Sequence, residues 1–220
     1  MKAVLFDLGG TLIKNAPVPE IFGRILALQG IQKPLAQIAS AFKEVEEQLN
    51  PEDYTLPYRE FWRLFNGRIL TRLGIRTNLE GLADAVTDAW WDNAELELYP
   101  DARETLTDLK RKGLKLGIVT NGFQKDVDDI LSRTSLKGLF DVTVGVDAAG
   151  KPKPERAIFL YALEKLGVPP RETVFVGDNP TADYEGAKNA GVKPLLIDRD
   201  DHQPKKFVKI RDLRELSKCI

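Results

Sequence analysis

Five short runs of the chain are apolar at nearly every position, and helical patterns fill the stretches between them. Strands of this kind are typical of a parallel sheet that is buried on both faces. Their alternation with helices predicts a doubly wound parallel α/β sheet. The runs cover about residues 2–7, 114–119, 142–146, 173–176 and 193–198.

Start and stop signals predict where helices of this α/β part begin and end. Asp101 and Glu104 have the spacing of a capping box, so we expect Asp101 to accept hydrogen bonds from the first helical turn. Pro154 suits the first turn of a helix that Gly167 closes. After Asp183, the small residues Gly186, Ala187 and Ala190 would allow close packing of a helix on the sheet.

The stretch from about residue 15 to 98 has no strand pattern and predicts helices only. We expect a helical-bundle cap domain, residues 15–95, inserted into an α/β core domain of residues 1–14 and 96–220. Ligands bind at the carboxyl ends of parallel strands, so an insertion that leaves after the first strand would cover a site there. A helical domain without a role at the site is the alternative. The helices are expected near 18–29, 34–49, 57–73 and 79–94.

Composition excludes several classes of function. The 220 residues carry a formal net charge of −1, which argues against nucleic acid or an anionic membrane as a partner. Neither a long apolar run nor a cleavable signal pattern is present, so a cytoplasmic protein is expected, as a monomer or homodimer. Cys219 cannot form an intramolecular disulfide, and the single His202 disfavours a Ser-His-Asp triad or a histidine-rich metal site.

Several predicted strands are followed by side chains that could act together on a phosphate group. The carboxyl ends of parallel strands lie at one edge of the sheet, so these residues can converge. A carboxylate can attack phosphorus, a lysine can neutralise it, and further carboxylates can hold Mg²⁺. The residues are Asp7, Thr120, Asn121, Lys151, Lys153, Asp178 and Asp183.

Four motifs in a fixed order give the chain a resemblance to a known family. They are Asp7–Thr11, Val119–Gly122, the Lys-Pro loop at 151–154 and Gly177–Asp183. The chain resembles the haloacid dehalogenase (HAD) superfamily of hydrolases, in the subfamily with a helical cap inserted after the first motif. The resemblance implies a HAD-like Rossmannoid core and a Mg²⁺-dependent phosphohydrolase that acts on a small phosphorylated metabolite, a phosphomonoester.

The resemblance also implies roles for individual residues. Asp7 would be the nucleophile that forms an aspartyl-phosphate, and Thr120 would hydrogen-bond the transferring phosphoryl group. Each of two residues also has a purely structural alternative. Thr120 would merely end a strand, and Asp183 would merely cap a helix. The implied substrate contacts are Leu8, Gly9, Asn121 and Gly122. The implied Mg²⁺ ligands are Asp7, the Gly9 carbonyl, Asp178 and Asp183, the last either directly or as the partner of a ligand.

Two lysines compete for the role of the site lysine. The family's usual run is Lys-Pro-Asp-Pro-x-Ile-Phe, and the spacing from Lys153 to Ile158-Phe159 matches it. We therefore favour Lys153. Lys151, which begins a Lys-Pro-x-Pro pattern, is the alternative.

Gly9 departs from the family pattern. Phosphatases of the family usually have an Asp two positions after the nucleophile, which protonates the leaving group and later activates water. Three interpretations remain open. The protein is a phosphatase that is slow or uses another acid/base group, a metal-independent 2-haloacid dehalogenase, or a non-catalytic or weakly catalytic protein that binds phosphometabolites. The acidic motif at 178–183 argues against the dehalogenase, which needs no Mg²⁺.

Overall fold

A computed structural model describes all of residues 1–220. The chain divides into two compact units. The core unit consists of Met1–Lys14 and Glu97–Ile220, and the helical unit consists of Asn15–Leu96. Each unit buries apolar side chains of its own, so each has a hydrophobic core.

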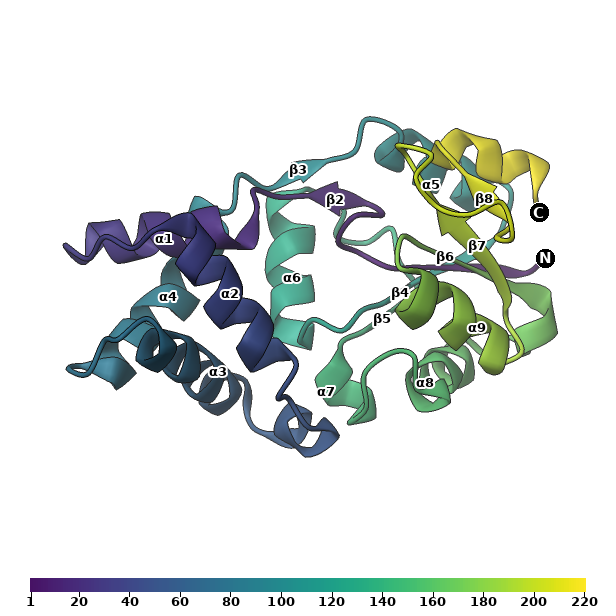
Figure 1. The fold of residues 1–220 in the computed structure, drawn as a ribbon. Helices are drawn as coiled ribbons and strands as arrows, with labels where there is room; N and C mark the ends of the chain where they lie inside the picture. The colour runs from purple at the N-terminus through teal and green to yellow at the C-terminus, as the bar shows by residue number, and fades with distance from the viewer. The chain divides into compact units, whose positions relative to one another are not determined.

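A six-stranded sheet forms the centre of the core unit, in the order β5-β4-β1-β6-β7-β8 (Figure 1). All neighbouring strands are parallel, which confirms the predicted sheet. Successive strands run outward from β1 in both directions, so the order reverses beside β1 and creates the crevice where such sheets bind ligands. The strands are β1 (Ala3–Phe6), β4 (Lys115–Val119), β5 (Val142–Val144), β6 (Thr173–Gly177), β7 (Lys193–Ile197) and β8 (Lys209–Ile210).

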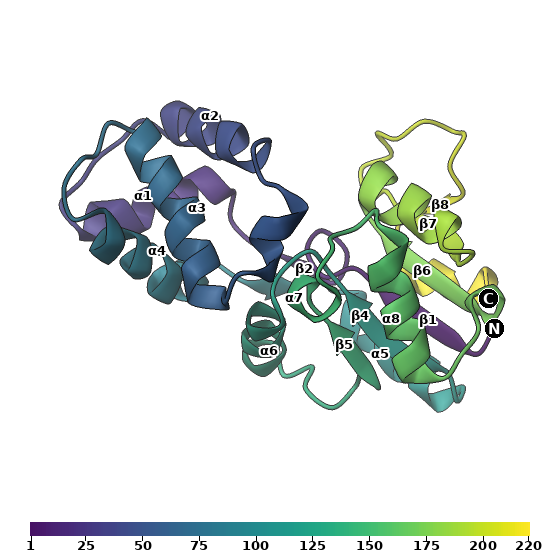
Figure 2. The same cartoon turned by 90° about the horizontal axis from the view of Figure 1, so that it is seen from below.

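Helices cover both faces of this sheet. Helices α8 and α9 lie on one face, while α5 and the C-terminal turns η4 lie on the other (Figures 1 and 2). On the first face Phe159 of α8 meets Phe175 of β6 edge to face, with 5.0 Å between ring centroids. The helical elements are α5 (Ala102–Arg111), α6 (Gln124–Arg133), α7 (Val146–Ala149), α8 (Arg156–Leu166), η2 (Pro170–Glu172), η3 (Pro180–Glu185), α9 (Gly186–Asn189) and η4 (Leu213–Lys218).

Glycine permits the close approach of α9 to α8. A Cβ atom on Gly186 would lie 2.9 Å from the ring of Phe159 and 3.0 Å from the Cα of Pro154. This close approach is to α8 and the loop before it, not to the sheet against which the small residues were predicted to pack. Pro154 itself lies just before α8, which begins at Arg156, rather than in its first turn.

Four amphipathic helices make up most of the helical unit and agree with the four predicted from the sequence. A polar seam joins α3 to α4, where Arg63 donates two hydrogen bonds of 2.8 Å to Asp84. None of the helices in the protein combines the length and apolar character needed to cross a membrane. The elements are α1 (Val18–Leu28), α2 (Leu35–Glu46), η1 (Pro51–Thr55), α3 (Tyr58–Arg72) and α4 (Leu79–Asn93).

Two further local predictions are wrong. Residues 97–98 fall in the stretch expected to lack strands, yet β3 (Glu97–Leu98) pairs antiparallel with β2 (Ile13–Lys14). Asp101 does not cap α5 with its side chain. Its carboxylate instead accepts hydrogen bonds from Arg199 at 2.8 and 3.2 Å and from the Leu213 N–H at 2.8 Å. A long-range charge pair has displaced a local cap that the sequence pattern also allowed.

Candidate active site

The three central strands of the sheet each end in a candidate residue. Asp7 follows β1, Thr120 follows β4 and Asp178 follows β6. The Asp7 N–H donates to the Val176 carbonyl at 2.8 Å, so the strand pairing continues up to the carboxylate. Because β4, β1 and β6 are neighbours and parallel, all three residues lie at one edge of the sheet.

A buried lysine lies between two buried carboxylates at this edge. Lys153 Nζ is 2.6 Å from Asp7 Oδ1 and 2.6 Å from Asp183 Oδ1. The side chains of Lys153, Asp7 and Asp183 are only 3%, 11% and 2% exposed. Buried charges are costly unless they are paired, so the ammonium between the two carboxylates offsets part of the cost of burying them here.

Asp183 reaches the site from the helical turn η3. Asn179 begins this turn, and its side chain accepts hydrogen bonds of 2.9 Å from the N–H groups of Thr181 and Ala182. Asp183 Oδ2 accepts from the Asn179 N–H at 2.9 Å. A Cβ atom on Gly177 would lie 2.3 Å from Asp183 Cγ, so a glycine at the end of β6 is what makes room for this carboxylate.

The turn after Asp7 is equally constrained. Leu8 offers its carbonyl to the N–H groups of Leu12 and Ile13 at 2.9 and 3.0 Å. Gly10 has φ +73°, and a Cβ atom there would lie 2.3 Å from Asp178 Oδ2. Glycine is therefore required at position 10 both by the left-handed backbone and by the nearby carboxylate. Leu8 is buried, so only its backbone is available to a ligand.

The electrostatics of the site favour a proton or a cation beside Asp7. Burial, together with the charges of Asp183 and Asp178, outweighs Lys153 and raises the pKa of Asp7 to about 7. Burial and the charge of Asp183 also raise the pKa of Asp178. Burial lowers the pKa of Lys153, but the two carboxylates more than offset this and raise it overall, so the ammonium stays charged.

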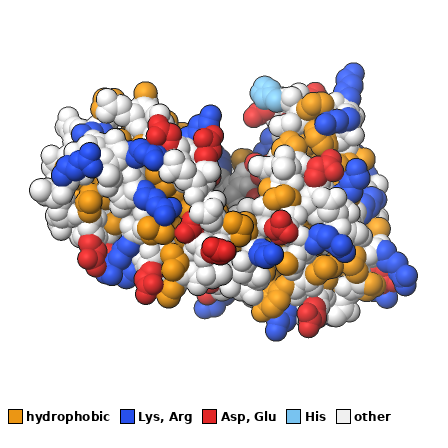
Figure 3. Space-filling model, turned by 60° about the horizontal axis from the view of Figure 1, so that its bottom comes forward, with side chains coloured by type: hydrophobic (Ala, Val, Ile, Leu, Met, Phe, Trp, Pro, Cys, Tyr) orange, Lys and Arg blue, Asp and Glu red, His pale blue; other side chains and the backbone are white.

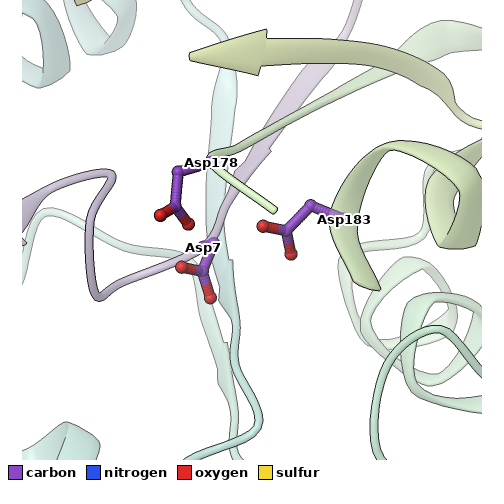
Figure 4. A group of neighbouring side chains, drawn as sticks. All are labelled: Asp7, Asp178 and Asp183. Carbon is purple, nitrogen blue, oxygen red and sulfur yellow. The ribbon is translucent and has the colours of Figure 1, made fainter. Parts of the chain in front are cut away.

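Three carboxylates form a group that has the chemistry of a divalent-cation site. Oxygen atoms of Asp7, Asp178 and Asp183 lie within 4.8 Å of one another, and Figure 4 shows them turned toward a common space. Carboxylate oxygens are the ligands that Mg²⁺ prefers, and a bound cation would relieve the repulsion that raises the pKa values of Asp7 and Asp178. The donor set therefore fits Mg²⁺.

The segment after β4 lies against the lysine loop. Asn121 Oδ1 accepts a hydrogen bond of 2.6 Å from the Lys153 N–H, and Asn121 Nδ2 donates one of 3.1 Å to the Lys153 carbonyl. Thr120 is buried, and its hydroxyl accepts from the Gly122 N–H at 3.2 Å. The structure thus brings Lys153, rather than the exposed Lys151, to Asp7.

Position 9 has no side chain and has space for one. Gly9 is exposed, its φ is not positive, and a Cβ atom there would have no other atom within 4 Å. The single histidine, His202, lies exposed at the surface (Figure 3).

The family assignment rests on both sequence and geometry. A model of the haloacid dehalogenase-like hydrolase family matches residues 1–191. The chain belongs to this family. This hydrolase is 32% identical over 209 residues to the glyceraldehyde 3-phosphate phosphatase of Methanopyrus kandleri, covering 92% of this chain and 86% of that protein. It is 28% identical to the phosphoserine phosphatase of Thermus thermophilus, with 98% of each chain covered.

A solved structure agrees with the same family. The crystal structure of a HAD phosphatase from Thermococcus onnurineus matches the hydrolase with a TM-score of 0.71 and 32% sequence identity. The match covers 100% of this chain and 97% of that one. The similarity therefore extends over both units of the hydrolase.

One residue that contacts the turn after Asp7 was not among the candidates predicted from the sequence. Arg199 follows β7 and donates to the Thr11 carbonyl at 2.8 Å as well as to Asp101. Its guanidinium lies 3.6 Å from the ring centroid of Tyr99. An isolated arginine after an apolar run is a weak signal, and only the tertiary structure reveals that Arg199 contacts the turn after Asp7.

Proposed function

We propose that this hydrolase is a Mg²⁺-dependent phosphatase that hydrolyses a small phosphomonoester through a phosphorylated Asp7. The observation that carries the proposal is the buried Asp7–Lys153–Asp183 arrangement, with 2.6 Å between the ammonium and each carboxylate. A carboxylate placed at the end of a buried strand and held by a lysine is suited to nucleophilic attack on phosphorus.

The proposed reaction has two steps. Asp7 attacks the phosphorus atom, the ester P–O bond breaks, and the leaving alkoxide takes a proton from solvent water to become the alcohol. A water molecule then attacks the phosphorus of the aspartyl-phosphate, the bond between phosphorus and the Asp7 oxygen breaks, and the proton lost by that water returns to solvent. Inorganic phosphate is released and the Asp7 carboxylate is restored. Lys153 orients Asp7 and offsets the negative charge that gathers on the phosphoryl oxygens, and the Thr120 hydroxyl would hydrogen-bond one of them.

The hydrogen bonds that the carboxylates already make indicate which of their oxygens would bind Mg²⁺. Both oxygens of Asp183 already accept hydrogen bonds, from Lys153 and from the Asn179 N–H. The second oxygen of Asp7 and the exposed Asp178 are therefore the proposed direct carboxylate ligands, with the Gly9 carbonyl beside them. Asp183 would support them through Lys153. A bound Mg²⁺ supplies positive charge that lowers repulsion between the nucleophile and the phosphate.

The helical unit is proposed to serve as the cap of the enzyme. It is inserted between residues 14 and 97, and residue 14 is only seven positions beyond Asp7 in the chain. An insertion at this point in the sequence is suited to admit substrate and then to exclude water from phosphoryl transfer. Substrate selection would then depend on side chains of this unit.

A second candidate function rests on Gly9. Without an acid/base group at this position, a protein that binds a phosphometabolite with little turnover would keep the same site. A positioned acid/base group contributes about 10²–10⁴-fold to rate, so its absence permits slow turnover as well as none. We favour the slow enzyme, because Asp7, Lys153 and the acidic group are all retained.

The test is phosphate release from a panel of phosphorylated metabolites, with Mg²⁺ and with a chelator. We expect release that requires Mg²⁺ and is lost in Asp7→Ala, while Asp129→Ala, at an exposed ion pair on α6, retains it. Binding without release would favour the second candidate. Metal-independent halide release from a 2-haloacid, or phosphate release that survives Asp7→Ala, would contradict the proposed mechanism.

A further inference from the structure

The side chain of Asn121 holds both backbone groups of one residue, Lys153. Its Oδ1 accepts from the Lys153 N–H at 2.6 Å, and its Nδ2 donates to the Lys153 carbonyl at 3.1 Å. Thirty-two positions separate the two residues, so this contact joins two distant segments. Two hydrogen bonds on either side of one Cα atom restrict both the position and the rotation of the residue that carries the ammonium.

The loop that carries Lys153 has few backbone donors with which to attach itself to its surroundings. It lies between α7, which ends at Ala149, and α8, which begins at Arg156. Pro152 and Pro154 flank Lys153 and have no N–H groups, so Lys153 supplies the only backbone donor of this tripeptide. Asn121 accepts from that donor. Without it, the buried N–H would lose its partner, and the loop would lose its link to β4.

The residues on both sides of Asn121 are attached to the end of β5 and to the segment that follows it. The Thr120 N–H donates to the Val144 carbonyl at 3.1 Å, and the Val146 N–H donates to the Gly122 carbonyl at 2.9 Å. The residues before and after Asn121 are thus fixed by backbone hydrogen bonds. A side chain that starts from so rigid a segment can impose its geometry on the lysine loop.

Lysine has a long side chain, and its position depends on where that side chain begins. Four carbon atoms separate the Lys153 backbone from Nζ, and the loss of rotamer entropy opposes a single placement of such a chain. Yet Nζ lies at 2.6 Å from both Asp7 and Asp183. A fixed backbone reduces the freedom that must be lost to place the ammonium between two carboxylates.

We propose that Asn121 is a positioning residue, which acts on the reaction by holding Lys153 between Asp7 and Asp183 rather than by contacting the phosphate. The inference rests on the proposed phosphatase function. It replaces the role that the family resemblance implied for Asn121, because both ends of its amide already face the Lys153 backbone.

A double-mutant cycle tests the proposal. Asn121→Ala should lower kcat about 10- to 100-fold with little change in KM, since small displacements of reacting groups have effects of this size. In a Lys153→Met background, Asn121→Ala should change kcat little, because the group that it positions is gone. Equal losses in both backgrounds, or a loss confined to KM, would overturn the proposal. Asn189→Ala, at an exposed asparagine of the same unit, is the control and should retain wild-type activity.

A conservative variant covers the case in which Asn121→Ala does not fold. Asn121→Asp keeps an acceptor for the Lys153 N–H and loses the donor to its carbonyl, so it should retain part of the activity. Activity equal to that of Asn121→Ala, measured in a protein with a native circular-dichroism spectrum, would argue against the two-bond contact.

Hydrogen exchange separates this proposal from the proposed function. The amide proton of Lys153, followed by NMR, should exchange faster in Asn121→Ala and at the wild-type rate in Asn189→Ala. Unchanged protection in Asn121→Ala would overturn the contact even if the enzyme is a phosphatase. Absence of phosphate release from the wild-type protein, together with faster exchange in the variant, would instead contradict the function and leave the contact standing.

Discussion

At the scale of single residues, position 9 offers the sharpest test of catalysis. Gly9→Asp should raise kcat for an alkyl phosphate, by up to about 10²-fold, because it supplies a proton donor beside the leaving group. The backbone and the open space at this position accept the new side chain. Phosphate release under saturating Mg²⁺ is the measurement.

The control for this change keeps its size and removes its acidity. Gly9→Asn should leave kcat near the wild-type value. If Gly9→Asp also leaves kcat unchanged, then proton transfer does not limit turnover, or another group carries it out.

The pKa of Asp7 would set how binding of the proposed Mg²⁺ depends on pH. Burial raises this pKa to about 7, so below pH 7 the carboxyl is mostly protonated and must lose its proton to bind the cation. Mg²⁺ affinity should therefore increase as the pH rises from 5.5 to about 7.5. Calorimetry in two buffers of different ionisation enthalpy should detect close to one proton released per Mg²⁺ at pH 6 and almost none at pH 8. Pronounced release at pH 8, or none at pH 6, would contradict this assignment.

The sequence indicated why some residues would meet at the candidate site, whereas other contacts there depend on the fold. Asp7 and Asp178 stand at the ends of apolar strands, and parallel pairing alone brings such ends together. The spacing to Ile158-Phe159 favoured Lys153, and the structure places that lysine against Asp7. The contact of Asn121 with the Lys153 backbone was not predictable, because it depends on the path of a loop between two prolines.

At the scale of elements, the turn after β1 depends on glycine for two separable reasons. Gly10 and Gly113 both have positive φ, but only at Gly10 would a Cβ atom meet another group, Asp178. Gly10→Ala and Gly113→Ala should each lower the free energy of unfolding by about 1 kcal/mol. Only Gly10→Ala should also weaken Mg²⁺ binding, because it displaces Asp178. Equal Mg²⁺ affinities in the two variants, measured by calorimetry, would show that Asp178 is not needed for the cation.

The same turn is held from outside by an ion pair that joins four segments. Arg199 contacts Asp101, Tyr99 and the Thr11 carbonyl, and Asp101 also accepts from the Leu213 N–H. Asp101 is 2% exposed and Arg199 is 19% exposed. Arg199→Met would leave a buried carboxylate without its charge partner, so it should lower the free energy of unfolding by about 3 kcal/mol.

An exposed ion pair provides the comparison for Arg199. Arg111→Met breaks a pair with Asp108 on the surface of α5 and should change stability by less than about 1 kcal/mol. Urea denaturation of the two variants measures both values. A similar small loss for Arg199→Met would mean that the Asp101 carboxylate finds another partner.

Element boundaries show where local patterns are sufficient and where they are not. The five longer strands each carry a continuous apolar run, which is why they were predictable. A two-residue strand such as β3 has no periodicity to detect, and its pairing with β2 depends on both segments meeting in the fold. Asp101 is a different case. Its spacing to Glu104 is that of a capping box, but its carboxylate binds Arg199, 98 positions away, instead of capping α5.

At the scale of the whole molecule, the carboxylate group belongs entirely to the core unit, which has a hydrophobic core separate from that of the helical unit. A ligand that binds only the folded form stabilises it by about 2.7 kcal/mol when its concentration is 100 times its Kd. Mg²⁺ should therefore slow hydrogen exchange in peptides from β1, β4 and β6 much more than in peptides from α1 to α4. Hydrogen exchange with mass spectrometry, with and without Mg²⁺, makes the comparison directly. Asp178→Asn, which removes a proposed ligand, should abolish the slowing in the sheet. Equal slowing in both units would mean that they unfold together, and that Mg²⁺ binding at the sheet edge stabilises the helical unit to the same extent.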